Sequence, residues 1–284
     1  MWLMPATINK IRHTTGTGNP QLDQDIVRLV EYSKGVFAKY CRHITKNDIN
    51  TALKDKTIVE LGPGDTIATG LFFLAYGAAR VVCFDRFKLV LNSQKNTLIA
   101  HQILSILPEQ QRIRLQSIIS FDERKYLSVD TKHFQYLHNR NENIPLENKS
   151  VDIIASNAVL EHVQDVEALF ANMYRILKPG GIMVHAADLK SHDLHHITAL
   201  DFLAVSDWLW RLMTFYRGAP NRKRWSYYKN LLDAHDFQLT FLKITSTVPA
   251  ESILKLRLKH PQQAKQFSDE DLSCGGFLFA ALKP

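Results

Sequence analysis

Short apolar runs separated by helical stretches limit the folds open to this chain more than any other feature of its sequence. Runs with strand character lie at 57–61, 79–84, 133–137, 151–156 and 182–187, and helical patterns lie between most of them. Strands that alternate with helices indicate βαβ units, in which crossover helices join parallel strands. The sequence therefore predicts an α/β fold, a Rossmann-like and mostly parallel sheet with helices on both faces.

The pattern divides the chain into three parts. Residues 1–50 contain a polar arm and then a helical extension, because apolar residues recur at helical spacing between 21 and 44. Residues 51–187 hold the alternating core. Residues 188–284 are predicted to add capping helices and two final antiparallel strands to the same fold.

Composition excludes disorder of the whole chain, and charge narrows the choice of partner. Apolar residues make up 45% of the 284 residues and charged residues 22%, which is enough to bury a core. The formal net charge is +7, and residues 207–265 account for all of it, with eleven basic and four acidic side chains. A nucleic-acid-coating protein would show this excess along most of its length, so no nucleic-acid partner is expected. The local excess predicts an anionic acceptor, or an anionic membrane surface that presents one.

Cysteine usage and the apolar pattern predict a protein of a reducing compartment. Cys41, Cys83 and Cys274 are scattered and odd in number, which argues against a disulfide framework and a cysteine zinc site. The first residues lack a basic start followed by an apolar run, and no apolar stretch approaches the ~20 residues that span a bilayer. We expect a cytoplasmic protein without a transmembrane segment. Peripheral membrane contact and the oligomeric state stay open.

A glycine turn follows the first predicted strand. Gly62-Pro63-Gly64 leads from this strand into a helical stretch, and glycine lets the backbone pass close to a ligand. A dinucleotide-binding fingerprint has a third glycine, whereas Ile67 stands at that position here. The motif by itself fits either a ligand-binding turn or a plain turn.

An acidic residue closes the second predicted strand. Asp85 lies 21 residues after Gly64, at the spacing and strand end from which a carboxylate can accept both hydroxyls of a ribose. Aspartate is also a preferred helix N-cap, which is the competing interpretation.

A third motif surrounds the fourth predicted strand. Residues 150–163 read Ser-Val-Asp-Ile-Ile-Ala-Ser-Asn-Ala-Val-Leu-Glu-His-Val, and Leu-Lys-Pro-Gly-Gly follows at 177–181. With these motifs the chain resembles the class I S-adenosylmethionine-dependent methyltransferases, in particular the methyltransferase domains that act on small molecules in sugar and polysaccharide clusters. The resemblance covers about 55–187, with four motifs in the family's order. It implies a seven-stranded sheet with S-adenosylmethionine across the carboxyl ends of strands one, two and four.

The resemblance also implies which residues bind the cofactor. The methionyl part would face Glu60 and the glycine backbone, the ribose would face Asp85, and the adenine would lie beside Phe84 or Arg86. The family often carries an Asp on the adenine amine, where this chain offers Asn139 or Arg140. The implied set is Glu60, Gly62, Gly64, Asp85, Arg86 and Asn157.

The region after the fifth strand normally lines the acceptor pocket in this family. Here four histidines and two aspartates fall within 185–196, and a histidine can accept a hydroxyl proton near neutral pH. We predict His192 as the base, with His162 as the second candidate. His185, Asp188 and His195 are predicted to contact the acceptor. A divalent metal held by the cluster, or an exposed loop without a role, are the alternatives, and we predict no metal.

The cap supplies the remaining acceptor candidates. Arg222 and Arg224 lie in an Asn-Arg-x-Arg stretch that looks like that of the glycan-cluster relatives, and Trp225 follows directly. Arginine binds carboxylate or phosphate well, and aromatic faces stack on sugars. The competing interpretation is that Trp208, Trp210 and Trp225 form the core of the cap.

These observations favour O-methylation of a sugar or other small hydroxylated metabolite, anionic or neutral, with a histidine base. N-methylation of a small amine and a catalytically idle S-adenosylmethionine-binding module are the alternatives. Methylation of a nucleic-acid base is disfavoured, because Asn157-Ala158-Val159-Leu160 stands where an Asn-Pro-Pro-Tyr-type motif would be expected.

Overall fold

The computed structural model describes residues 25–87, 93–139, 142–191, 198–214 and 219–284. Seven strands within these residues form one sheet in the order β5-β2-β1-β6-β7-β9-β8. The first five strands in this order are parallel, and β9 runs antiparallel to both β7 and β8. The predicted Rossmann-like α/β fold is confirmed. The strands are β1 (Thr57–Leu61), β2 (Arg80–Asp85), β5 (Phe134–His138), β6 (Val151–Asn157), β7 (Leu177–Asp188), β8 (Gln238–Thr247) and β9 (Cys274–Leu282).

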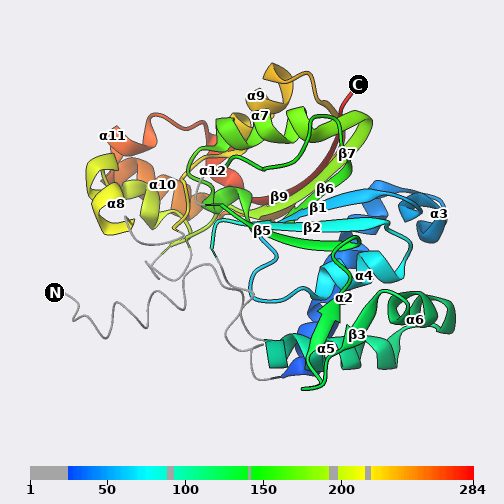
Figure 1. Cartoon of the computed structure of the whole chain (residues 1–284). Coiled ribbons are helices and arrows are strands. Elements are labelled where there is room, and N and C mark those ends of the chain that lie inside the picture. Colours follow the sequence, from blue (N-terminus) through cyan, green and yellow to red (C-terminus); the bar gives the residue numbers. More distant parts are fainter. Residues whose placement is uncertain (1–24, 88–92, 140–141, 192–197, 215–218) are drawn as a thin grey trace.

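Helices cover both faces of the sheet (Figure 1). On one face α2, α4 and α5 enclose a core that contains Phe37, Leu71 and Ile99. On the other face α7 and α9 enclose a core that contains Met173 and Tyr228. These helices are α2 (Ile26–Ile44), α4 (Ala68–Ala75), α5 (Ser93–Ile106), α7 (Val166–Ile176) and α9 (Trp225–Ala234).

The central strand β1 sets the position of the site. It pairs in parallel with β2 on one side and β6 on the other, so that Leu61 lies in register with both Phe84 and Ser156. The chain order reverses between these neighbours, and ligands of open α/β sheets bind at the crevice that such a reversal opens at the carboxyl ends.

Two segments differ from the sequence-based reading. The polar segment 108–132, which the pattern left unassigned, folds into α6 (Glu109–Gln116) and the hairpin of β3 (Ile119–Phe121) and β4 (Leu127–Val129). The fifth parallel strand, β7, begins at Leu177 and not at Ile182, so it includes the Pro-Gly turn. Leu177 pairs with Val151, and a register shift in β6 after Val151 accommodates the extra residues.

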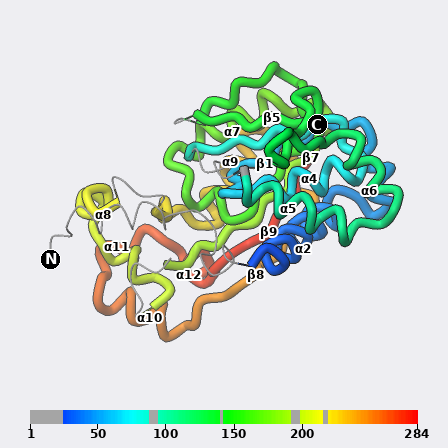
Figure 2. The backbone as a smooth tube through the Cα atoms, turned by 60° about the horizontal axis from the view of Figure 1, so that its bottom comes forward, coloured from blue at the N-terminus to red at the C-terminus, as the bar shows by residue number. Residues whose placement is uncertain are grey.

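The chain after β7 builds an accessory unit beside the sheet, which lies at one end of the molecule in Figure 2. It contains η2 (Asp201–Ala204), α8 (Asp207–Thr214), α10 (Ala250–Lys259), α11 (Pro261–Ala264) and α12 (Asp269–Ser273). These elements share a small core that includes Phe202, Trp210, Leu256 and Leu272.

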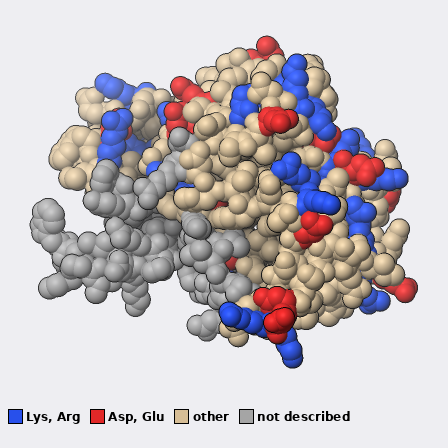
Figure 3. All heavy atoms as spheres, in the orientation of Figure 1, with Lys and Arg blue, Asp and Glu red and all other residues tan. Residues whose placement is uncertain are grey.

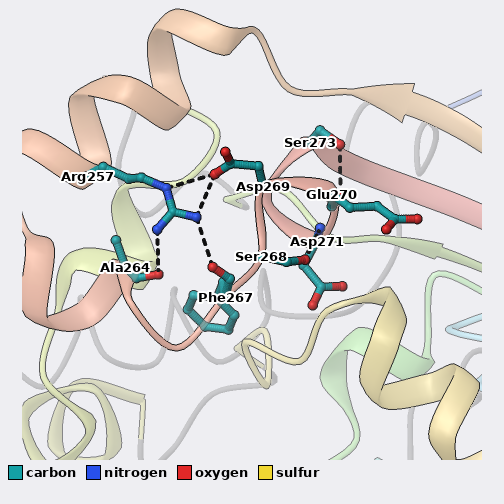
Figure 4. Close-up of polar contacts among 8 residues, drawn as sticks. All are labelled: Arg257, Ala264, Phe267, Ser268, Asp269, Glu270, Asp271 and Ser273. Carbon is teal, nitrogen blue, oxygen red and sulfur yellow. Dashed lines mark hydrogen bonds and ion pairs between the residues drawn. The ribbon is translucent and has the colours of Figure 1, made fainter.

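Arg257 ties the last three helices of the accessory unit together (Figure 4). Its Nε donates to Asp269 Oδ1 at 2.8 Å, and its Nη2 donates to the Phe267 carbonyl at 2.9 Å. Its Nη1 reaches the Ala264 carbonyl at 3.3 Å. One side chain on α10 therefore fixes the connection from α11 to α12. No helix within the described residues is long and apolar enough to cross a membrane.

The turn after β1 requires glycine for two separate reasons. Gly62 has a φ of +61°, in the left-handed region that other residues adopt only under strain. A Cβ at this position would lie 2.4 Å from Val159 Cγ2, on the turn that follows β6. The backbone at Gly62 therefore lies in close contact with the neighbouring strand's turn, and Gly62 N donates to the Phe84 carbonyl at 2.8 Å.

We expect Gly62→Ala to lower the free energy of unfolding by about 1–3 kcal/mol, because it adds backbone strain and a clash with Val159. Chemical denaturation measures this change. Gly35→Ala on α2 is the matched control, since no heavy atom lies within 4 Å of its Cβ. The control should be neutral or slightly stabilising. Equal stability of both variants would contradict the constraint on Gly62.

Candidate active site

A pocket opens at the carboxyl ends of β1 and β2. Its wall also includes the turn after β6, so all three central strands contribute to it. The lining residues are Leu61, Gly62, Phe84, Asp85, Arg86, Phe87, Glu142, Ala158, Val159, His162, Val163 and Leu169.

Asp85 lies in this wall with its carboxylate held by backbone donors. Phe87 N donates to Oδ1 at 2.7 Å, and the N–H groups of Gly64 and Arg86 also donate to the carboxylate. The side chain is 7% exposed, and burial raises its pKa to about 6. The carboxylate is fixed against the glycine turn, where it can accept further hydrogen bonds.

Glu60 lies on β1 and is buried, with 4% exposure. Burial raises its pKa to about 7, and the Thr69 hydroxyl and Cys83 thiol donate to its carboxylate. Tyr40 on α2 is close enough for the charge of Glu60 to raise the pKa of its phenol. A cationic ligand beside this carboxyl group would favour its ionised form.

Asn157 ends β6 and contacts α2. Its Oδ1 accepts from Lys39 Nζ at 2.7 Å, and its Nδ2 donates to Tyr32 Oη at 3.1 Å. Sequence reasoning did not identify Tyr32 and Lys39 as partners of Asn157. Their spacing indicated a shared position, because Tyr32 and Lys39 are seven residues apart and so lie two turns apart on one face of the helix.

The segment that follows β5 also differs from the expected set. Asn139 lies against the second strand, with its N–H donating to the Asp85 carbonyl at 3.2 Å, while Arg140 falls outside the described residues. Glu142 lines the pocket, although sequence reasoning did not select it. Arg86 also lines the pocket and donates to Gln164 Oε1 at 2.9 Å.

A larger open cleft adjoins the pocket and reaches the accessory unit. The two cavities share Arg86, His162 and Val163 in their walls. The cleft is further lined by Arg211 on α8 and by Lys223, which gives it a basic wall beside the cofactor pocket. His162 is therefore one of the residues that line both cavities.

Asn221 fixes the short helix that carries His162. This helix, η1 (Leu160–His162), directly follows the third motif of the sequence. Asn221 Nδ2 donates to the carbonyls of Leu160 and Val163 at 2.7 and 2.9 Å, and its N–H donates to the Glu161 carbonyl at 2.6 Å. Asn221 is therefore a positioning residue for His162, which sequence reasoning did not identify.

The cap residues predicted to bind the acceptor have other partners. Arg224 is 2% exposed, and its three guanidinium nitrogens donate to the carbonyls of Asp271, Leu189 and Cys274. Trp225 packs against Phe277 with a centroid distance of 5.0 Å. These contacts hold α9 and β9 together, so both side chains have structural partners. Arg224 also lines the adjoining cleft, and the acceptor role of both residues stays a prediction.

Arg222 has a similar structural position. Its Nη1 donates to the Val205 carbonyl at 2.8 Å, and its Nη2 forms an ion pair with Asp207 at 3.2 Å. The guanidinium lies 5.6 Å from the ring centroid of Trp210. It lines the basic cleft but is fixed by the start of α8.

The acceptor residues predicted after the fifth strand lie in different environments. His185 on β7 is fully buried, its Nδ1 lies 2.6 Å from Ser156 Oγ, and burial lowers its pKa to about 3. It is a neutral residue of the sheet interior. Asp188 is partly exposed and pairs with Lys190 at 3.5 Å. His192 and His195 lie outside the described residues.

Metal binding was the alternative role for these side chains. Among the residues that the structure describes, no group of three His, Cys, Asp or Glu side chains could hold a metal ion.

The strand order, the glycine turn and the pocket define a ligand-binding domain of the methyltransferase type, and comparison with known proteins agrees. Residues 59–185 match a family model described as a methyltransferase domain. A malonyl-[acyl-carrier protein] O-methyltransferase of Methylovorus sp. (strain MP688) is 22% identical over 199 residues, which are 66% of this chain and 56% of that protein. The match thus spans just over half of the relative's length.

Solved structures share the fold. The geranyl diphosphate C-methyltransferase from Streptomyces coelicolor A3(2) has a TM-score of 0.51 at 14% identity, over 95% of this chain and 87% of that one. An S-adenosylmethionine-dependent methyltransferase from Mesorhizobium loti has a TM-score of 0.49 at 16% identity, over 88% and 100%. Residues 59–185 form a methyltransferase domain, which confirms the predicted methyltransferase and its cofactor S-adenosylmethionine for this part of the chain.

Glu161, between the two cavities and β7, has an unusual environment. It is 1% exposed, its Oε1 accepts from Asp188 N at 3.0 Å, and its buried Oε2 has no hydrogen-bond partner among the described residues. Burial raises the pKa of Glu161 to about 8 from an ordinary value of 4.5. A carboxyl group with a raised pKa binds a proton on folding, so its contribution to stability is full below pH 4.5 and is lost as the pH rises through 8.

We expect the ligand-free protein to lose stability as the pH rises from 6 to 8, and Glu161→Gln to reduce that slope by up to about 1.4 kcal/mol per pH unit. Denaturant titrations across this pH range measure the slope. Glu31→Gln, on the exposed side of α2, is the matched control and should leave the slope unchanged. Superimposable slopes for the wild type and Glu161→Gln would refute the raised pKa.

Proposed function

We propose that this chain transfers the methyl group of S-adenosylmethionine to a hydroxyl oxygen of a small anionic acceptor, such as an acidic or phosphorylated sugar. The observation that carries the proposal is the position of His162 in the walls of both the cofactor pocket and the basic cleft. A side chain at this junction can contact an acceptor that enters from the cleft. The name of the curated relative, an O-methyltransferase, supports oxygen as the methylated atom.

The residues of the pocket fit the cofactor. Asp85 offers a carboxylate to the ribose hydroxyls, and the missing Cβ at Gly62 lets the turn pack against Val159 of the pocket wall. The family resemblance would place the methionyl part beside Glu60 and Asn157, which are not among the residues that line the pocket. Asn157 contacts Tyr32 and Lys39 of α2, and Glu60 lies near Tyr40 of the same helix. When bound, the cofactor supplies an electrophilic methyl group on a sulfonium centre.

His162 has the role of the general base in this proposal. An imidazole can accept the hydroxyl proton as the oxygen attacks, and Asn221 holds the backbone that carries it. Arg211 and Lys223 in the cleft favour an acceptor with a carboxylate or phosphate group. His192, our first choice from the sequence, stays a proposal of the same kind, and both histidines are tested in one assay.

A carboxylate acceptor is the second candidate, because the relative's name contains a malonyl group and the cleft is basic. A carboxylate is already ionised at neutral pH, so its methylation needs no base.

We expect Asp85→Asn to weaken binding of S-adenosylhomocysteine by roughly 10–100-fold, because hydrogen bonds to a charged group are among the stronger ones. Isothermal titration calorimetry measures the affinity. Asp233→Asn, exposed on α9, should bind as the wild type does. Absence of binding to the wild type would refute the proposed activity, and unchanged affinity of Asp85→Asn would refute only the ribose contact.

We expect His162→Gln to reduce kcat by roughly 10²-fold or more while the affinity for S-adenosylhomocysteine changes far less. Formation of S-adenosylhomocysteine from S-adenosylmethionine is measured with a panel of uronic acids and sugar phosphates. His235→Gln, at the end of α9, is the control, and His192→Gln tests the alternative base. If His162→Gln and His192→Gln both keep full turnover on a carboxylate-bearing substrate, methylation of a carboxylate replaces methylation of a hydroxyl as the proposed reaction.

A further inference from the structure

The cleft beside the cofactor pocket carries more positive charge than its own acidic side chains can neutralise. Two acidic side chains line it, and both are already engaged. Asp207 forms an ion pair with Arg222 at 3.2 Å. The Asp271 carboxylate accepts from the N–H of Ser226 at 2.9 Å and from its hydroxyl at 2.5 Å. Five basic side chains line the same cleft, namely Arg86, Arg211, Arg222, Lys223 and Arg224.

Two of these five cations have structural partners. Arg222 is paired with Asp207, and Arg224 is 2% exposed and donates to three backbone carbonyls. The other three are Arg86, Arg211 and Lys223. Among the residues that the structure describes, none of these three forms an ion pair with an acidic side chain. The uncompensated charge of the cleft therefore lies on them.

Neutral groups hold two of the three uncompensated cations. Lys223 Nζ lies 4.0 Å from the ring centroid of Tyr227. The Arg86 guanidinium lies 5.7 Å from the ring centroid of Phe87, and its Nη2 donates to Gln164 Oε1 at 2.9 Å. An aromatic ring or an amide orients a cation without cancelling its charge, which stays available to a further ligand. Both cations are half-buried, so salt and water screen them less than fully exposed charges.

Arg211 adds the third charge from the accessory unit. It follows Trp210 on α8, and Trp210 fixes this helix because its Nε1 donates to the Pro220 carbonyl at 3.2 Å. The three cations thus come from the residue after β2, from α8 and from the stretch before α9, and all of them line one cleft. Figure 3 shows Lys and Arg side chains gathered over the end of the molecule that carries α8 and α11.

This set of cations favours a phosphate group over a carboxylate. A phosphate monoester carries a charge of about −1.5 to −2 at neutral pH and has three acceptor oxygens. A carboxylate carries a single negative charge and has two oxygens. Arginine can bind phosphate with two parallel N–H···O bonds, and lysine binds it as a point charge. S-adenosylmethionine contains no phosphate, so a phosphate bound here belongs to the methyl acceptor.

We propose that Arg86, Arg211 and Lys223 form a phosphate subsite in the cleft, and that the methyl acceptor is phosphorylated. The acceptor role of the subsite rests on the proposed O-methylation, whereas phosphate binding by itself does not. Arg211 and Lys223 line the cleft and not the cofactor pocket. A phosphate held by them leaves a hydroxyl group elsewhere on the acceptor free to reach His162, which lines both cavities. A phosphate monoester and a diphosphate share this chemistry.

The test is isothermal titration calorimetry of the full chain with glucose 6-phosphate, glucuronate and pyrophosphate at low salt. We expect glucose 6-phosphate to bind at least about tenfold more tightly than glucuronate, and its affinity to fall as salt is added. Tighter binding of pyrophosphate than of glucose 6-phosphate would identify a diphosphate as the group that the subsite takes. The reverse order would identify a monoester.

We expect Arg211→Gln and Lys223→Gln each to weaken binding of glucose 6-phosphate by roughly tenfold, because each removes a charge-assisted hydrogen bond. Both variants should keep the wild-type affinity for S-adenosylhomocysteine, which also shows that they are folded, since neither residue lines the cofactor pocket. Lys229→Gln is the matched control. Lys229 lies on α9, is paired with Asp233 at 2.8 Å and does not line the cleft, so its loss should leave binding of glucose 6-phosphate unchanged.

No binding of glucose 6-phosphate to the wild type, or equal affinities for glucose 6-phosphate and glucuronate, would overturn the subsite. Wild-type affinity in both Arg211→Gln and Lys223→Gln, or an equal loss in Lys229→Gln, would overturn it as well. The titrations contain no S-adenosylmethionine, so any of these results leaves the proposed methyl transfer standing. Failure of the wild type to bind S-adenosylhomocysteine would contradict the methyl transfer and not the subsite.

Discussion

The parallel pairing of β1 with both β2 and β6 is the constraint on which the rest of the site depends. It brings the ends of three strands, which are far apart in the sequence, to one edge of the sheet. There Gly62 approaches Val159 of the next strand's turn, and Asp85 receives the N–H of Gly64 from the first turn. Each contact joins two strand ends. The pocket is therefore a consequence of strand order, and the glycine permits a closeness that any side chain would prevent.

A second constraint comes from the far end of the chain. Asn221 and Arg224 act on different parts of the core, but both do so through backbone carbonyls: Asn221 holds η1, and Arg224 holds the end of β7 against β9 and α12. Carbonyl ligation by buried polar side chains satisfies groups that would otherwise lose their hydrogen bonds on burial. The stretch that joins α8 to α9 thereby couples the accessory unit to the turn that carries His162. The placement of His162 therefore depends on contacts made by Asn221 in this segment.

The sequence predicted the central features because local signals and tertiary structure agree there. The bounds of β1 at Thr57–Leu61 and the end of β2 at Asp85 follow from apolar runs that stop at Gly62 and at an acidic residue. Other features depend on partners distant in sequence. The run from Leu177 extends the strand through glycine because Val151 pairs with it, and the role of Arg224 depends on three carbonyls at distant positions. From sequence alone, a basic residue in a loop is predicted to bind an anion, because its distant carbonyl partners are not known.

Three buried carboxyl groups connect this architecture to ligand binding. Burial raises the pKa of Asp85, Glu60 and Glu161 to about 6, 7 and 8, so each of them disfavours its charged form in the ligand-free protein. Together they lower the stability of the folded chain as the pH rises through this range. Hydrogen-bond donors or positive charge on a ligand favour the carboxylate form and reverse the effect locally. A ligand that supplies both to Asp85 and Glu60 therefore stabilises the fold most at the pH where the empty site weakens it. The free energy of unfolding and the affinity for the cofactor therefore both depend on the free energy of ionising these buried carboxyl groups.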